Sequence, residues 1–185
     1  MDILEFLQTR NSMPRLTDPP PTSDDMAKVY KSALRAPDHA WLRPWKFLQY
    51  SNESLKLLSE AFENTAKSLD PHIDKKRLER VKNAPFRAPL VIVLVADIKQ
   101  HPKVPKIEQM LSLAAAGQNI LLSLEFLGYG AIWRTGNMAF NKEIVKELNL
   151  EPHQEVIGYI YTGTPQGNKK DLPELDRKNF IEIFD

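Results

Sequence analysis

The fold depends on one apolar heptapeptide, Leu90-Val91-Ile92-Val93-Leu94-Val95-Ala96. It contains no polar residue and is rich in β-branched side chains. A strand with one face in water alternates apolar and polar residues, whereas an unbroken apolar run of this length indicates a strand buried on both faces. The heptapeptide therefore predicts a central strand that other elements must cover on both sides.

A second apolar segment follows, from Pro105 to Leu127. Its apolar residues do not keep to one stripe, and a helix that is hydrophobic nearly all round must be buried on several sides. A domain of this size covers such a helix with difficulty, so we expect a partner subunit, which the small residues 114–117 would allow to approach closely. Glu108 and Glu125 interrupt the segment, which argues against a membrane span of about twenty apolar residues.

Shorter segments predict the remaining elements. We expect strands at Trp45–Tyr50, Ala131–Trp133 and Val156–Tyr161, with helices before and between them. Because helices and strands do not alternate strictly, their order favours an α+β fold. We expect a central sheet with helices on both faces and a core shared by two chains.

The composition is that of an ordinary soluble globular protein, with 42% hydrophobic and 26% charged residues and a net charge of +1. A length of 185 residues predicts one domain over residues 1–185. The balanced charge gives no reason to expect nucleic acid or a membrane surface as a partner. The absence of cysteine excludes disulfides and thiolate sites, and the four histidines lack metal-ligand spacing. The N-terminus lacks signal-peptide features, so we expect a cytoplasmic protein.

Residues 35–47 combine aromatic rings and positive charge in one stiff loop, Arg35-Ala36-Pro37-Asp38-His39-Ala40-Trp41-Leu42-Arg43-Pro44-Trp45-Lys46-Phe47. Each proline pushes the preceding residue, Ala36 or Arg43, toward extended geometry. Rings to lie against and guanidinium groups to meet phosphate suit a planar, anionic ligand. A structural loop whose tryptophans fill the core explains the same residues equally well.

Two further segments carry motifs. Near the N-terminus, a short amphipathic helix ends in Arg10-Asn11-Ser12-Met13-Pro14-Arg15, and the long helix ends in Gly128-Tyr129-Gly130-Ala131-Ile132-Trp133-Arg134-Thr135-Gly136. Together with the Ala-Pro-x-His…Pro-Trp-x-Phe loop, their order and spacing resemble the nitroreductase family, and in particular its small bacterial NAD(P)H nitroreductases. Residues 83–89 and the glycines near Thr164 extend the resemblance over nearly the whole chain.

The resemblance implies a mostly antiparallel sheet in an intertwined homodimer that holds FMN at the subunit interface. It also implies that eight residues bind FMN, namely Arg10, Asn11, Ser12, Arg35, His39, Trp133, Arg134 and Thr135. The first three would meet the phosphate or the ribityl chain. The loop pair, Arg35 and His39, would reach the FMN bound mainly by the neighbouring subunit. The last three would lie along the flavin ring.

Two positions depart from the family pattern. Asn11 stands where the motif has a second arginine, and the next arginine, Arg15, lies behind a proline. Arg43 stands where the family has an amide before Pro-Trp. Two of the assigned residues also have a structural interpretation: Arg10 at the C-terminus of a helix suits the helix dipole, and Trp133 could be a core tryptophan.

The activity that the resemblance implies is an FMN-dependent reduction of nitroaromatics, quinones or similar acceptors, with NAD(P)H as donor, in a ping-pong cycle. No side chain is assigned a catalytic role, because a flavin carries this chemistry itself. Gly128-x-Gly130 lacks a third glycine and follows a helix, and both departures argue against a Rossmann turn. Two alternatives stay open: another flavin reaction on the same fold, such as dehalogenation or flavin fragmentation, and a non-catalytic flavin-binding protein.

Overall fold

Five strands form one antiparallel sheet at the centre of the protein, whose computed structural model describes residues 2–184. The strand order is β1-β5-β3-β2, and β4 also pairs with β5. The strands are β1 (Leu16–Thr17), β2 (Trp45–Ser51), β3 (Leu90–Asp97), β4 (Gly130–Arg134) and β5 (Gln154–Pro165). Every strand pair is antiparallel, which confirms the predicted type of sheet.

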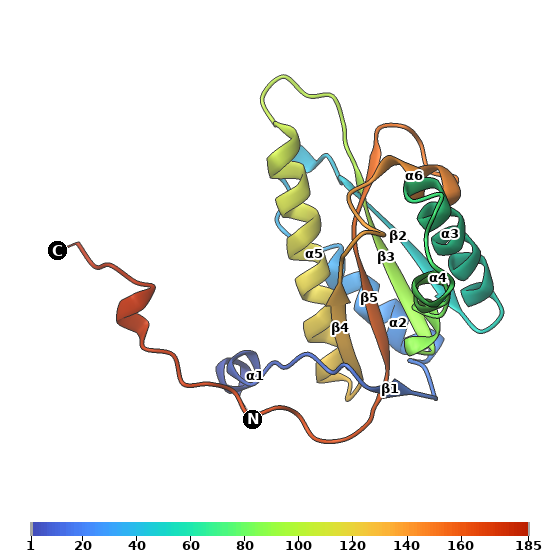
Figure 1. The fold of residues 1–185 in the computed structure, drawn as a ribbon. Coiled ribbons are helices and arrows are strands. Elements are labelled where there is room, and N and C mark those ends of the chain that lie inside the picture. Colours follow the sequence, from blue (N-terminus) through green and yellow to red (C-terminus); the bar gives the residue numbers. More distant parts are fainter. Residues whose placement is uncertain (1, 185) are drawn as a thin grey trace.

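Helices cover both faces of this sheet (Figure 1). One face carries α2 (Ser23–Ala33) and α5 (Lys106–Phe126), and the other carries α3 (Ser54–Leu69) and α6 (Lys142–Glu147). Helix α1 (Ile3–Gln8) lies beside the end of α5, and α4 (Lys75–Lys82) packs against α3. Single 3-10 turns complete the fold: η1 (His39–Trp41), η2 (Pro85–Arg87) and η3 (Arg177–Asn179).

Polar side chains cap the N-termini of three helices. The Thr22 hydroxyl accepts the backbone N–H of Asp25 at the start of α2, and Asp24 and Asp25 lie in its first turn. Asp74 caps α4 and Asn141 caps α6 in the same way. These contacts satisfy backbone N–H groups that have no partner inside the helix, and the acidic residues favour the positive end of the helix dipole.

Strand β3 is buried on both faces, as the sequence predicts. Leu90, Ile92 and Leu94 pack in the core beneath α2 and α5. Val91, Val93 and Val95, which alternate with them, pack in the second core beneath α3 and α6. The two cores are therefore separated by the sheet, and β3 contributes to both of them.

One chain covers only part of the surface of α5. Its buried side includes Leu113, Ala116, Ile120 and Leu124, which face the sheet. On its outer side Ile107 and Leu111 are exposed, and Phe126 is 76% exposed. The predicted burial on several sides is thus not achieved by this chain alone.

Two features of the backbone were not predicted. The two-residue strand β1 pairs Leu16 with Pro165 and Thr17 with Thr164. The last strand, expected at residues 156–161, runs from Gln154 to Pro165 because β3, β4 and β1 all pair with it. Beyond it, residues 168–184 form an arm that stands away from the body, with η3 as its only regular element among the described residues (Figure 1). None of the helices between residues 2 and 184 is long and apolar enough to cross a bilayer.

Candidate functional site

Residues 10–12 lie beside strand β4. The backbone N–H of Met13 donates to the carbonyl oxygen of Ala131 at 2.9 Å, which holds the segment after α1 against this strand. The side chain of Arg10 is half-buried and forms no ion pair or hydrogen bond with residues 2–184. The structure therefore brings two of the predicted groups, residues 10–12 and residues 133–135, onto neighbouring segments, with a guanidinium group left free.

Asn11 binds the start of the C-terminal arm. Its side-chain Nδ2 donates to the carbonyl oxygen of Lys170 at 2.6 Å, and its backbone N–H donates to Glu125 Oε2 at 3.3 Å. Lys169 forms an ion pair with the same Glu125. Two lysines that the sequence analysis did not assign thus lie next to residues 10–12. The only sequence feature that could have indicated them is that two lysines stand next to each other.

Trp133 and Arg134 leave β4 on opposite faces of the sheet. Trp133 packs against the core beneath α5, whereas its neighbour Ile132 packs against the core beneath α3. The guanidinium carbon of Arg134 lies 5.7 Å from the ring centre of Tyr161, which belongs to that second core. The alternation of a strand explains this arrangement. The two side chains therefore do not line one common surface, although their backbone groups lie on the same strand.

The indole of Trp133 fills a slot between two glycines. A Cβ atom at Gly117, in α5, would lie 2.5 Å from Trp133 Cζ3, and one at Gly158, in β5, would lie 2.1 Å from its Nε1. Both distances are far below van der Waals contact, so only glycine permits the ring to lie there. The interpretation of Trp133 as a core tryptophan thus has a structural basis, while the ring remains partly exposed.

Arg134 keeps a buried polar atom without a partner. Its Nε is inaccessible to solvent and finds no hydrogen-bond acceptor within residues 2–184. Such an atom costs free energy unless a ligand or water satisfies it. Burial raises the pKa of the neighbouring Tyr161 phenol to about 12, although Arg87 and Arg134 both act to lower it. Tyr161 therefore stays neutral at physiological pH and supplies no counter-charge to Arg134.

The loop of residues 35–43 is held in an unusual backbone conformation. Arg43 is non-helical as predicted, but its φ of +52° is left-handed rather than extended. The reason is Asp38, whose carboxylate accepts the Arg43 backbone N–H at 2.9 Å and the Arg43 guanidinium at 3.2 Å. His39 Nδ1 lies 2.7 Å from Glu108 Oε2, which ties the loop to the start of α5. Of the two loop tryptophans, Trp45 is buried as the structural interpretation expects, and Trp41 is exposed.

The eight predicted residues do not converge within one chain. Asn11 contacts Glu125 near the end of α5, whereas His39 contacts Glu108 near its start. These two glutamates are 17 positions apart, which is about 25 Å along a helix that rises 1.5 Å per residue. Arg35, which follows α2, is exposed, and Thr135 is exposed beyond the end of β4. The chain therefore assembles one group around β4 and presents Arg35 and His39 elsewhere.

The same motifs match known proteins. The profile of the nitroreductase family matches residues 7–164. This chain belongs to the nitroreductase family. It is 34% identical over 166 residues to "Putative NAD(P)H nitroreductase YdjA" of Escherichia coli (strain K12), with 90% of each chain covered.

Solved structures of nitroreductases have the same fold. A nitroreductase-like family protein from Bacillus cereus superimposes with a TM-score of 0.86 at 22% identity, covering 100% of this chain and 96% of the other. A nitroreductase with bound FMN from Bacteroides fragilis NCTC 9343 gives a TM-score of 0.74 at 19% identity, with both chains fully covered. The α+β nitroreductase fold predicted from the sequence is thereby confirmed.

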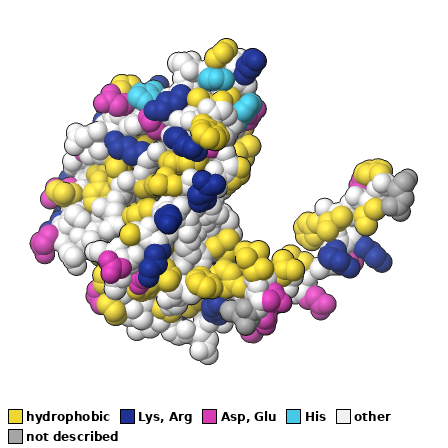
Figure 2. All heavy atoms as spheres, turned by 180° about the vertical axis from the view of Figure 1, so that it is seen from behind, with side chains coloured by type: hydrophobic (Ala, Val, Ile, Leu, Met, Phe, Trp, Pro, Cys, Tyr) yellow, Lys and Arg dark blue, Asp and Glu magenta, His cyan; other side chains and the backbone are white. Residues whose placement is uncertain are grey.

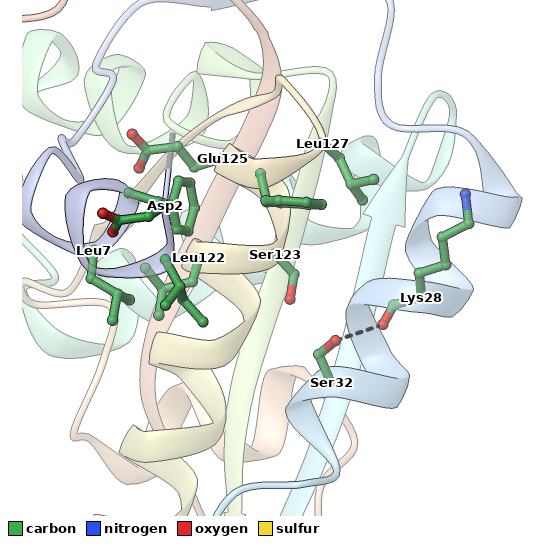
Figure 3. Close-up of a pocket in the computed structure, with 11 residues that line it drawn as sticks. Asp2, Leu7, Lys28, Ser32, Leu122, Ser123, Glu125 and Leu127 are labelled. Atoms are coloured by element: carbon green, nitrogen blue, oxygen red, sulfur yellow. Dashed lines mark hydrogen bonds between the residues drawn. The ribbon is translucent and has the colours of Figure 1, made fainter.

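A large apolar hollow of about 780 Å³ adjoins the segment of residues 10–12, because Glu125, which lines it, accepts the backbone N–H of Asn11. It is bordered by α1, α2 and the end of α5, and Figure 3 shows Leu7, Leu122 and Leu127 around it, with Lys28 and Glu125 at its edges. Phe6 and Phe126, which also line it, meet edge to face at 5.7 Å. None of the eight residues predicted to bind FMN lines this hollow itself.

The slot of Trp133 leads to a stability prediction. In an exposed helix, Gly117→Ala would stabilise by about 1 kcal/mol, because alanine is the better helix former. Here the new methyl group would overlap the indole, and we expect a net loss of about 1–3 kcal/mol in the free energy of unfolding. Urea unfolding of Gly117→Ala against Gln118→Ala, an exposed neighbour on the same helix, measures the difference. A Gly117→Ala protein as stable as the control would contradict the packing described here.

Proposed function

We propose that this protein is an FMN-dependent oxidoreductase that uses NAD(P)H to reduce nitroaromatics, quinones or similar acceptors. The observation that carries the proposal is Arg10, whose half-buried guanidinium has no partner within residues 2–184. On the adjoining strand, Arg134 adds a buried Nε without an acceptor. A dianionic phosphate with a hydroxylated chain supplies the acceptors that such groups lack. Membership of the nitroreductase family and the FMN named with the Bacteroides fragilis structure support the same cofactor.

The residues around β4 would hold the cofactor as follows. Arg10 and Ser12 would meet the phosphate or the ribityl chain, and Lys170, held near them by Asn11, would add positive charge. Backbone groups of residues 133–135 would bind the ring edge, together with the Thr135 hydroxyl. The side-chain amide of Asn11 already binds the C-terminal arm. Asn11 would therefore contribute to FMN binding by positioning its neighbours Arg10 and Ser12, and not through its own amide.

A bound FMN would supply the redox chemistry, namely hydride acceptance from a reduced nicotinamide and electron transfer to an acceptor. The protein would bind and orient the reactants, and positive charge near the flavin would stabilise its reduced, anionic form. Within residues 2–184, no three His, Asp or Glu side chains cluster in a way that could hold a metal ion. We assign no side chain to bond making or bond breaking, because a flavin carries this chemistry itself.

The purified protein itself tests the proposed function. It should be yellow, release FMN rather than FAD on denaturation, and lose its flavin absorbance when NADPH or NADH is added without oxygen. A colourless protein that does not take up FMN would refute the cofactor assignment. A yellow protein that neither nicotinamide reduces would instead be a flavin-binding protein without reductase activity. Identification of the products formed with nitroaromatic, quinone and halogenated compounds separates reductase activity from other flavin reactions.

Arg10→Ala should weaken FMN binding more than it slows reduction of the remaining holoenzyme. A charge-assisted contact with phosphate contributes about 1.5–3 kcal/mol, so affinity should fall about tenfold to a hundredfold. The matched control is Arg80→Ala on the exposed surface of α4. Equal loss of flavin from both variants would refute a phosphate contact by Arg10. Full affinity in Arg10→Ala would shift the assignment to Arg15.

We also propose that the functional unit is a homodimer with FMN at the interface. Glu108, which contacts His39, and Glu125, which contacts Asn11, are about 25 Å apart along α5, farther than one FMN molecule extends. A second copy, related by a twofold axis, would bring its own Arg35 and His39 to the β4 group of the first. The same copy would cover the outer side of α5 and the apolar hollow beside it.

The C-terminal arm supports this assembly. Four of its last five described residues are apolar and exposed, and Phe184 is 89% exposed. Figure 2 shows these hydrophobic side chains on an arm that projects from the body. An arm that makes so few contacts with its own chain gains stability only by packing against another surface. Exchange of arms between two copies would bury both arms and would account for their composition.

Removal of apolar side chains from the arm should weaken the dimer. Burial of a Phe or Ile side chain contributes about 1.5–3 kcal/mol, so Phe180→Ser combined with Ile183→Ser should raise the dimer dissociation constant by at least about a hundredfold. Leu57→Ser, on the exposed side of α3, should have no such effect. Sedimentation equilibrium measures both constants. A wild-type protein that is monomeric at micromolar concentration with flavin bound would refute the homodimer.

A further inference from the structure

We infer that Trp41 is a specificity-determining residue: its exposed indole stacks on planar, electron-poor acceptors and favours them over acceptors without a ring. Trp41 is the largest apolar side chain that the body of the protein leaves in solvent, with 79% of its surface exposed. Tryptophan is usually well buried. A core role therefore does not explain this residue.

The indole is held in place from one side. The Arg43 guanidinium carbon lies 5.3 Å from the centre of the Trp41 ring, within the range of a cation–π interaction. Arg43 is itself fixed by Asp38, whose side chain is only 3% exposed and accepts both the backbone N–H and the guanidinium of Arg43. A buried carboxylate thus orients an arginine, and the arginine supports one face of the indole. The other face remains open to a ligand.

The backbone of this loop is strained. Ala40, Trp41 and Arg43 all have left-handed conformations, with φ of +56°, +55° and +52°. Residues other than glycine rarely adopt such angles, and a bulky residue there is an outlier. Strain of this kind persists where the surrounding structure imposes it, and it clusters at functional sites. A surface residue with no role would relax, so the strain supports a fixed position for the indole.

The position of Trp41 relative to the flavin rests on the proposed function. His39, two residues earlier, is one of the residues proposed to complete the FMN site of the second subunit. Two residues of chain span at most about 7 Å, so Trp41 lies at the edge of that site. An acceptor that approaches that site from solvent would then meet the exposed indole.

The chemistry of an indole indicates which acceptors it favours. An electron-rich ring with a large open face stacks well on electron-poor rings such as quinones and nitroaromatics. Dihydronicotinamide is itself electron-rich and gains less from such a contact. Trp41 would therefore affect the acceptor half of the reaction more than the NAD(P)H half.

The test compares Trp41→Phe and Trp41→Asn holoenzymes with the wild type, using menadione as a ring acceptor and ferricyanide as an acceptor without a ring. Removal of a stacking contact of this kind weakens binding about fivefold to a hundredfold, so the Asn variant should raise the KM for menadione by that factor. The Phe variant should retain most of the affinity. The KM values for ferricyanide and NADPH should change little. Titration of the oxidised holoenzyme with menadione, followed by tryptophan fluorescence, should show the same order of affinity without turnover.

Two controls separate stacking from a structural role. Phe86→Ala removes an exposed aromatic side chain from the opposite side of the sheet and should leave the KM for menadione unchanged. Asparagine tolerates left-handed angles, so Trp41→Asn should melt no lower than the wild type. A lower melting temperature, or a weaker dimer in sedimentation, would show that the indole packs against protein and would overturn the inference. If Trp41→Asn binds FMN and is reduced normally but its KM for menadione is unchanged, the inference about Trp41 is wrong and the proposed function stands. If the wild type does not bind FMN, the proposed function is wrong as well.

Discussion

The absence of polar side chains on β3 is the constraint from which the rest of the architecture follows. Because both faces of this strand are apolar, each needs a layer of helices, and two separate cores result. On one face α3 and α6 are amphipathic enough to close their core and meet water. On the other face the covering helix, α5, is apolar on its outer side as well. This apolar face of β3 is buried by α5, but the apolar outer side of α5 is not buried by this chain and requires another surface to cover it.

The large elements follow from patterns that a single sequence carries. The unbroken run at β3 and the apolar helix of residues 106–126 were both predictable, because hydrophobic periodicity depends mainly on which face is buried. Strand β1 was not predictable, since two residues carry no period and their pairing depends on the distant Pro165 and Thr164. The length of β5 was underestimated for a similar reason: it is set by its three partner strands rather than by its own composition.

In the candidate site, some features could be predicted from the sequence and others required the tertiary fold. The order of the motifs pointed to the right family, and the alternation of β4 already implies that Trp133 and Arg134 face opposite ways. The slot between Gly117 and Gly158 could not be predicted, because the two glycines lie on different elements and each is unremarkable in its local sequence. The separation of His39 from residues 10–12 along α5 also requires the tertiary fold. Asn11, which the motif presents as a departure, proved to be a contact to a lysine far along the chain.

The contact between Asn11 and Lys170 would link cofactor binding to subunit association. Asn11 joins the segment proposed to hold the FMN phosphate to the first residues of the arm proposed to reach a second subunit. A ligand that orders one end of this connection lowers the entropy that remains to be lost at the other. Because such coupling is reciprocal, cofactor and partner would each tighten the binding of the other. Loss of flavin and loss of quaternary structure would then be linked on dilution, because each would weaken the other.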